Sequence, residues 1–124
     1  MAFAKYYWNE SSRAAYAGNT STLERLYEPE CDVCREYVSM VNKDTEKGLR
    51  TNINATIITA AAVTDDANGR SDQAVTLAAT DEEHELIDQS GKAVGRIEKL
   101  DYRVIIYVDW KGGEWTVVDS FMII

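Results

Sequence analysis

The fold is decided near the C-terminus, where residues 102–123 read YRVIIYVDWKGGEWTVVDSFMI. Two runs rich in β-branched and aromatic residues flank Gly112 and Gly113, a pattern that predicts a β-hairpin with a two-residue turn. In that register Trp110 lies opposite Trp115, an aromatic cross-strand pair that contributes about 0.2 to 1 kcal/mol. This hairpin is therefore expected to form one end of an antiparallel sheet.

The same register predicts which side chains share a face of the hairpin. One face would carry Val108 by Val117, Ile106 by Asp119, Val104 by Phe121 and Tyr102 by Ile123, and the other Tyr107 by Val118, Ile105 by Ser120 and Arg103 by Met122. Both faces are apolar, and a large exposed apolar face is typical of an interface. We expect one face to pack on helices and the other to meet a second subunit in a homodimer.

Upstream of the hairpin, β-branched residues predict further strands over 53–64, 74–88 and 97–110, the last of which enters the hairpin, before the final strand over 115–123. The connections Asn68-Gly69 and Ser90-Gly91 carry the glycine that tight hairpin turns require. Consecutive strands should therefore pair antiparallel, as a four-stranded meander.

Helical spacing dominates the chain before residue 49. Apolar residues predict one helix over 3–17, ended by Gly18-Asn19, and a third over about 33–47, ended by Gly48. Between them, residues 21–24 (STLE) match a capping box that would start a short second helix, burying Leu23, Leu26 and Tyr27. The predicted fold class is α+β: one domain spanning residues 1–124, with three N-terminal helices packed on a strongly curved four-stranded antiparallel sheet.

The composition excludes several partners. Twenty-one acidic residues against thirteen basic ones give a net charge of −8, which repels nucleic acid and anionic lipid. No apolar run reaches the length of a membrane helix, and the first residues lack the apolar core of a signal peptide. We expect a soluble chain that does not bind nucleic acid.

The motif Cys31-Asp32-Val33-Cys34 has three interpretations. A thioredoxin-like dithiol is opposed by the nearby Glu28, Glu30 and Asp32, because negative charge disfavours a thiolate. A zinc site would need more ligands than the two cysteines, and the only histidine is distant in sequence. A short structural disulfide between Cys31 and Cys34 would contribute about 2 kcal/mol and would imply an oxidising compartment.

A pocket is expected between the helices and the curved sheet, with its lining drawn from Tyr7, Tyr37, Ile106, Val108, Val117, Asp119 and Phe121. A carboxylate in such apolar surroundings has a raised pKa and serves as general acid or base. For Asp119 we favour the alternative, in which it lies at the sheet rim or accepts a hydrogen bond from a tyrosine hydroxyl or a backbone amide. We interpret His84, flanked by three glutamates, as a solvated strand residue rather than a catalyst. No motif for a cofactor or a metal is present, and we expect neither.

Three segments in order resemble a known family: residues 3–8 (FAKYYW), residues 15–23 (AYAGNTSTL) and residues 31–37 (CDVCREY). They are similar to a family of unknown function found in actinobacterial lipoproteins and secreted proteins, although the family pattern has Asp where this chain has Asn19. The resemblance implies the cone of the nuclear-transport-factor-2-like superfamily, which is also called SnoaL-like or cystatin-like. It also implies export, with a lipidated cysteine upstream of this chain as the only link to the membrane.

These observations lead to three functional hypotheses. The first is a non-catalytic extracytoplasmic module that binds a small apolar ligand or a protein partner. The second is an enzyme resembling ketosteroid isomerases or polyketide cyclases, with Asp119 or His84 as the proton shuttle. The third is thiol-disulfide exchange at Cys31 and Cys34.

Overall fold

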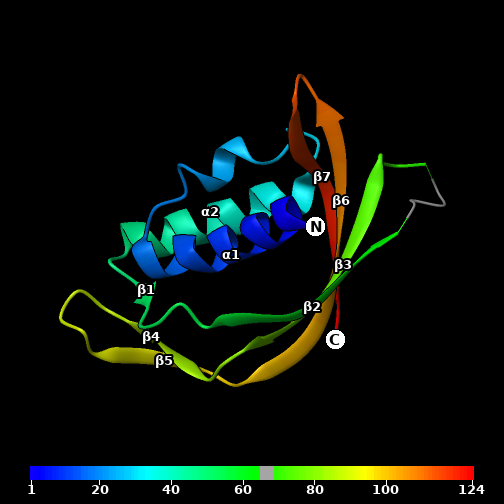
Figure 1. Cartoon of the computed structure of the whole chain (residues 1–124). Helices are drawn as coiled ribbons and strands as arrows, with labels where there is room; N and C mark the ends of the chain where they lie inside the picture. Colours follow the sequence, from blue (N-terminus) through cyan, green and yellow to red (C-terminus); the bar gives the residue numbers. More distant parts are fainter. Residues whose placement is uncertain (65–68) are drawn as a thin grey trace.

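The computed structural model describes residues 1–64 and 69–124 and has an α+β fold (Figure 1). Two α-helices, α1 (Ala2–Ala17) and α2 (Asp32–Glu46), lie side by side on the concave side of the strands, with the 3-10 turn η1 (Leu23–Arg25) between them in sequence. The strands are β1 (Arg50–Thr51), β2 (Thr56–Thr64), β3 (Gln73–Asp81), β4 (His84–Ile87), β5 (Ala93–Ile97), β6 (Leu100–Lys111) and β7 (Glu114–Ile123). Within the described ranges, no helix is long and apolar enough to cross a membrane.

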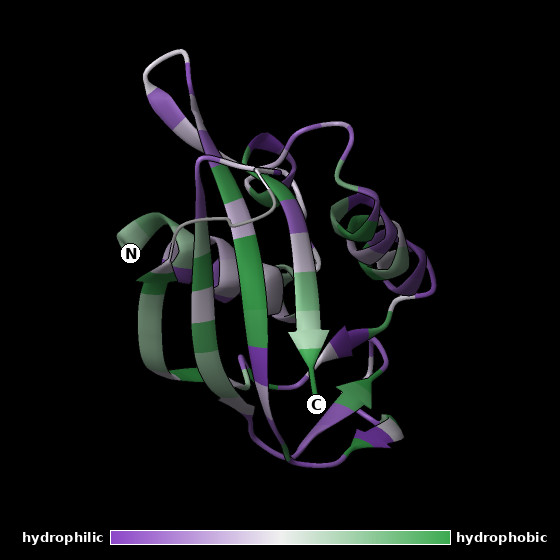
Figure 2. Ribbon diagram, turned by 90° about the vertical axis from the view of Figure 1, so that its right-hand side faces the viewer, coloured by the Kyte–Doolittle hydropathy of each residue, from purple (hydrophilic) through white to green (hydrophobic). Residues whose placement is uncertain are grey.

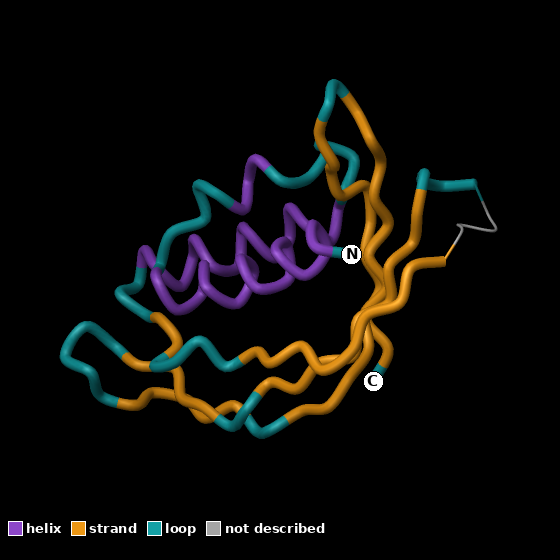
Figure 3. Tube along the Cα trace, in the orientation of Figure 1, coloured by secondary structure: helices purple, strands orange, loops and turns teal. Residues whose placement is uncertain are grey.

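The strands form two antiparallel sheets where a single four-stranded meander was predicted. The larger sheet has the order β2-β3-β6-β7, and the smaller has the order β1-β4-β5. Two of the predicted long strands each bend and change sheet, at residues 82–83 between β3 and β4 and at residues 98–99 between β5 and β6. Figure 3 shows these bends, which carry the chain from the upright sheet to the strands beneath the helices. The bends produce the curvature that makes room for a pocket.

The predicted second helix is only the single turn η1, so the expectation of three helices was wrong. The backbone after this turn is used by the sheet edge: Val117 N donates to Leu26 O, and Glu28 N donates to Val117 O. In a longer helix, Leu26 O and Glu28 N would bond within the helix and could not bond to Val117 of β7. The predicted capping box is also absent, because Ser21 N donates to the Asn19 side chain. Residues 26–28 therefore cover the edge of β7, where unpaired backbone groups would otherwise remain.

The C-terminal hairpin follows the predicted register only as far as Val117. Lys111 lies opposite Glu114 and Trp110 opposite Trp115, with the two indole rings 5.2 Å apart in an edge-to-face arrangement. Gly112 and Gly113 both have positive φ, at 58° and 83°, as a two-residue hairpin turn requires. The predicted turn at Ser90-Gly91 also connects two paired strands, β4 and β5. At the remaining predicted turn, Asn68 lies outside the described residues.

A β-bulge at Val118 changes every pairing beyond it. Val108 lies opposite Val117, but Tyr107 lies opposite Asp119, Ile106 opposite Ser120 and Val104 opposite Met122. An extra residue in one strand reverses the faces of all later side chains, because side chains alternate along a strand. The predicted pairs of Tyr107 with Val118, Ile106 with Asp119, Val104 with Phe121, Tyr102 with Ile123, Ile105 with Ser120 and Arg103 with Met122 were therefore wrong.

The main core lies between the helices and the concave face of the larger sheet. Its largest fully buried side chains are Leu23, Val75, Leu77, Val104, Ile106, Val108 and Val117. Each such aliphatic side chain contributes about 1.5 to 3 kcal/mol relative to an exposed one. Figure 2 shows the opposite, convex face, where the four strands run side by side with hydrophobic bands along them. A smaller cluster of Ala74, Tyr107 and Val118 lies on this convex side.

Candidate functional site

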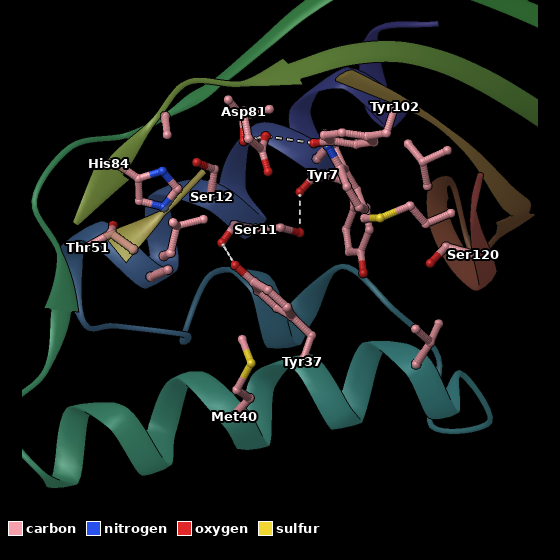
Figure 4. Close-up of a pocket in the computed structure, with 18 of the residues that line it drawn as sticks. Tyr7, Ser11, Ser12, Tyr37, Met40, Thr51, Asp81, His84, Tyr102 and Ser120 are labelled. Atoms are coloured by element: carbon pink, nitrogen blue, oxygen red, sulfur yellow. Dashed lines mark hydrogen bonds between the residues drawn. The ribbon is translucent and has the colours of Figure 1, made fainter. Parts of the chain in front are cut away.

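A pocket of about 350 Å³ opens between the two helices and the strands (Figure 4). Helix α1 contributes Tyr7, Trp8, Ser11, Ser12 and Ala15, and α2 contributes Val33, Tyr37 and Met40. The strands and their connections contribute Thr51, Ile53, Ala55, Thr56 and Asp81, together with His84, Ile97, Tyr102, Val104, Ser120 and Met122. A volume of this size is at the lower end of the range for small-molecule sites.

An apolar rim surrounds this pocket, and we define it as Val33, Met40, Ile53, Ile97 and Met122. These five side chains are 39 to 50% exposed, although their segments are far apart in the sequence. Single exposed apolar residues are ordinary, but several that converge on one opening typically mark a binding site. An entering ligand would therefore first meet apolar surface.

One wall of the pocket carries a polar network centred on Asp81, at the end of β3. Its Oδ1 accepts hydrogen bonds from Thr56 Oγ1 at 2.7 Å and from Tyr102 Oη at 2.8 Å. Trp8 Nε1 donates to Tyr102 Oη at 2.8 Å, and the two rings meet edge to face with centroids 6.0 Å apart. The network joins α1, β2, β3 and β6, so it holds Asp81 in place at the pocket wall.

Two further tyrosines each link one helix to the other by a hydrogen bond. Tyr37 Oη donates to Ser11 O at 2.5 Å, and Tyr7 Oη donates to Cys34 Sγ at 3.1 Å. Burial raises the pKa of both hydroxyls well above the ordinary tyrosine value, and the negative charge of Asp81 further raises the pKa of Tyr37. Both tyrosines therefore remain protonated donors at every physiological pH.

His84 lies in the pocket wall at the start of β4 and is only 9% exposed, so the interpretation of this residue as solvated was wrong. The adjacent Glu83 and Glu85 are exposed, and Glu83 forms an ion pair with Arg96 on the surface. His84 Nδ1 lies 2.7 Å from Glu82 O. Because a carbonyl oxygen only accepts, Nδ1 carries the proton, and Nε2 of the neutral ring is an acceptor.

The expected pocket lining is only partly found in the pocket. Tyr7 and Tyr37 line it, whereas Ile106, Val108 and Val117 are fully buried in the core instead. Asp119 and Phe121 lie on the convex face because of the bulge at Val118, so their expected place in the pocket lining was wrong. There, Asp119 Oδ2 lies 3.9 Å from Arg70 Nη1, and both side chains are about half exposed. Asp119 Oδ1 accepts from Ser120 N at 2.8 Å, which confirms the favoured alternative of a bond to a backbone amide.

Sequence reasoning missed Asp81, Tyr102 and Trp8, which form the polar network. Residues 74–88 were predicted as one continuous strand, within which Asp81 has no distinguishing feature. The consecutive polar and charged residues 81–85 (DEEHE), which interrupt the apolar alternation of this stretch, were the available signal of a bend there.

The two cysteines form the predicted disulfide at the N-terminus of α2. Cys31 and Cys34 are 1% and 2% exposed and belong to the main core. Thiol-disulfide exchange requires an attacking thiolate to reach a sulfur, so this burial argues against the redox interpretation. The described part of the chain contains no cluster of three or more histidine, cysteine, aspartate or glutamate side chains that could hold a metal ion.

The fold and the pocket together define a small α+β domain with a ligand-sized cavity between its helices and its sheets. The chain belongs to the family of unknown function DUF6318, whose model matches residues 1–120. Among curated proteins, none matches the sequence significantly. The family assignment confirms the resemblance to a family of unknown function, while the actinobacterial lipoprotein context stays a prediction.

Two solved structures share the fold at low sequence identity. The intermembrane space region of the chloroplast protein ARC6 has a TM-score of 0.63 and 13% identity, covering 97% of this chain and 93% of its own. A putative calcium/calmodulin dependent protein kinase II association domain from Xanthomonas campestris has a TM-score of 0.52 and 15% identity, covering 93% of this chain and 80% of its own. At such identities, these similarities show the fold alone.

Proposed function

We propose that this domain is a non-catalytic binding module that holds a small, largely apolar ligand in the pocket between its helices and sheets. The observation that carries this proposal is the apolar rim, whose five exposed side chains come from α2, the β1–β2 connection, β5 and β7. Pockets with mostly apolar walls and a few fixed polar groups are typical of small-molecule sites. Asp81 and His84 supply such polar groups here.

The site can be tested with N-phenyl-1-naphthylamine, a neutral dye that fluoresces in apolar surroundings. We expect one dye to bind per chain and the Met40→Glu variant to weaken binding at least about tenfold, because a rim carboxylate would have to lose water when the dye enters. Val94→Glu is the matched control, since Val94 is 52% exposed against 50% for Met40 but lies outside the pocket lining. Absence of dye binding, or equal effects of both variants, would contradict the proposal.

We further propose an extracytoplasmic location, with the domain secreted or tethered by a lipidated cysteine outside this chain. The buried disulfide supports this, since disulfides persist in oxidising compartments. The lipid tether and the nuclear-transport-factor-2-like cone rest on the family resemblance, and the two fold neighbours are consistent with the cone. Release of the full-length protein from membranes by a lipoprotein-specific lipase would test the tether. An unmodified N-terminal residue in the mature protein would exclude it.

A second candidate function is acid-base catalysis, and the observation that favours it is the orientation of His84. Its Nε2 is the acceptor atom of a nearly buried imidazole in the pocket wall. Such a base could take a proton from the carbon beside a bound carbonyl group and return it, as an isomerase does. Incubation with a β,γ-unsaturated ketone in deuterated water would then give deuterium incorporation that His84→Gln abolishes. Exchange no faster than in buffer would rule this candidate out.

We also propose a homodimer through the convex sheet face. Phe121 and Ile57, on the outer strands of that face, are 62% and 49% exposed, and one fold neighbour is described as an association domain. Light scattering should then give twice the chain mass for the native protein and the chain mass for Phe121→Glu. A native monomer at high concentration would contradict the proposal.

A further inference from the structure

The hydroxyl groups of the pocket wall point their protons at the protein itself. Among the serines and threonines, Ser11 donates to Tyr7 O, Ser12 to Asn54 Oδ1, Thr51 to Ile53 O and Thr56 to Asp81 Oδ1. Ser120 is the one hydroxyl of the lining without such a bond among the described residues. A hydroxyl has a single proton, so a group that donates within the wall has only lone pairs for a ligand.

The aromatic hydrogen-bond donors of the pocket wall also donate to other groups of the protein. Tyr7 donates to Cys34 Sγ, Tyr37 to Ser11 O and Tyr102 to Asp81, while Trp8 Nε1 donates to Tyr102. Figure 4 shows several of these bonds around the cavity. No lysine or arginine of the described chain lines the pocket. An occupant would therefore find almost no hydrogen-bond donor.

Acceptors remain free on one wall. Asp81 uses Oδ1 for both of its hydrogen bonds, and its Oδ2 has no hydrogen bond within the described ranges. In the neutral form of His84, three residues further along, Nδ1 donates to Glu82 O and Nε2 is left as an acceptor. Two acceptors on one wall of an apolar cavity call for a ligand that donates.

The charge of the site has the same preference. Asp81 is the only carboxylate among the described residues of the lining, and the chain has a net charge of −8. The negative charge of Asp81, on β3, acts as far as Tyr37 on α2. Burial raises the pKa of the Tyr37 hydroxyl, and the charge of Asp81 raises it further. A positive group in the cavity would be stabilised by this charge, and a negative group would be repelled.

We propose that the pocket takes an apolar amine, with its ammonium group on Asp81 Oδ2 and its apolar body against the rim. This inference rests on the proposed binding function and adds the chemical class of the ligand. It disfavours fatty acids, phosphates and sulfates, because their oxygen atoms would meet the acceptors Asp81 and His84, with the Ser120 hydroxyl as the one uncommitted donor among the described lining residues. A charge-assisted hydrogen bond at Asp81 distinguishes an amine from a neutral alcohol of the same shape.

The test uses three probes with one rigid apolar body: 1-adamantanamine, 1-adamantanol and 1-adamantanecarboxylate. Each is measured by isothermal titration and by displacement of N-phenyl-1-naphthylamine. We expect the amine to bind at least about tenfold more tightly than the alcohol, and the carboxylate to bind most weakly. Asp81→Asn should remove most of the preference for the amine, because the charge-assisted hydrogen bond of the ammonium group is lost and the affinity for the amine falls by a larger factor than that for the alcohol.

The matched control is Asp101→Asn. Asp101 also accepts a hydrogen bond from a threonine, Thr80, but it is exposed and outside the pocket lining. This variant should keep the preference for the amine. If Asp81→Asn does not fold, the order of the three probe affinities for the native protein still tests the proposal. Equal affinities for the three probes, or tighter binding of the carboxylate, would contradict the proposal that the ligand is an amine, but not the proposal that the pocket binds a ligand. Failure of the dye and of all three probes would overturn the binding function itself.

Discussion

Tyr107 of β6 lies opposite Asp119 of β7 on the convex face of the sheet. The bulge at Val118 produces this pairing, because without the extra residue Asp119 would lie opposite Ile106 and face the helices. One inserted residue thus moves a carboxylate from the core side to the surface and places Ser120 and Met122 in the pocket lining.

This arrangement predicts that Asp119→Ala changes the free energy of unfolding by less than about 0.5 kcal/mol, since the carboxylate is about half exposed and weakly paired with Arg70. Dye binding should be unchanged. The control is Val117→Ala, two residues earlier and fully buried, which should cost about 2 kcal/mol. Urea unfolding measures both variants, and a large loss of stability in Asp119→Ala would show that the residue faces inward.

Tyr102→Phe should destabilise the domain by about 1 to 3 kcal/mol, because it removes both the acceptor of Trp8 Nε1 and a donor to Asp81. Tyr107→Phe on the same strand is the control. Its hydroxyl accepts from the exposed Arg70, which can bond to water instead. Chemical denaturation of the two variants gives the comparison. Equal losses of stability in the two variants would mean that the hydrogen bonds around Asp81 stabilise the fold no more than an exposed hydrogen bond does.

Replacement of both Cys31 and Cys34 by alanine should lower stability by about 2 kcal/mol, the loop-closure contribution of so short a disulfide. In the native protein, the buried sulfurs should resist dithiothreitol until the domain unfolds. Alkylation followed by intact-mass measurement, with and without denaturant, detects the difference. Rapid reduction of the folded protein would restore the redox interpretation.

Stability should depend on pH through Glu28, which connects the segment before α2 to the hairpin. Hydrogen bonds from Lys111 and Thr116 hold the pKa of this carboxyl below its ordinary value of 4.5. A lowered pKa in the folded state stabilises the fold above the ordinary pKa, and this contribution disappears as the pH falls through the folded value.

The melting temperature of the native protein should therefore exceed that of Glu28→Gln at pH 7, with the gap closing below about pH 4. Glu30→Gln is the control, because Glu30 is a nearby exposed carboxylate. A gap that is the same at every pH would show that the charge of Glu28 is not responsible.

The local sequence determined each feature that depends on neighbouring residues. Helical spacing placed α1 and α2, the paired glycines placed the last hairpin with Trp110 opposite Trp115, and Cys31 and Cys34 were close enough to form a disulfide. These features follow from backbone preferences and from side-chain periodicity, which act over a few residues. Net charge and composition likewise required no structure.

Only the tertiary structure decided where the site lies. The bulge at Val118 and the bend at residues 98–99 come from fitting long strands around two helices, and no local pattern in the chain specifies them. The bend between Asp81 and His84 has a local signal in the charged residues around it, but its direction depends on the same packing. Likewise, residues 26–28 end a helical turn because the edge of β7 uses their backbone groups. The polar wall of the pocket joins Trp8 to Tyr102, which are 94 residues apart in sequence. Contacts over such distances depend on the packing of the whole chain, so the sequence predicted a pocket between the helices and the sheet, but not the polar wall that lines it.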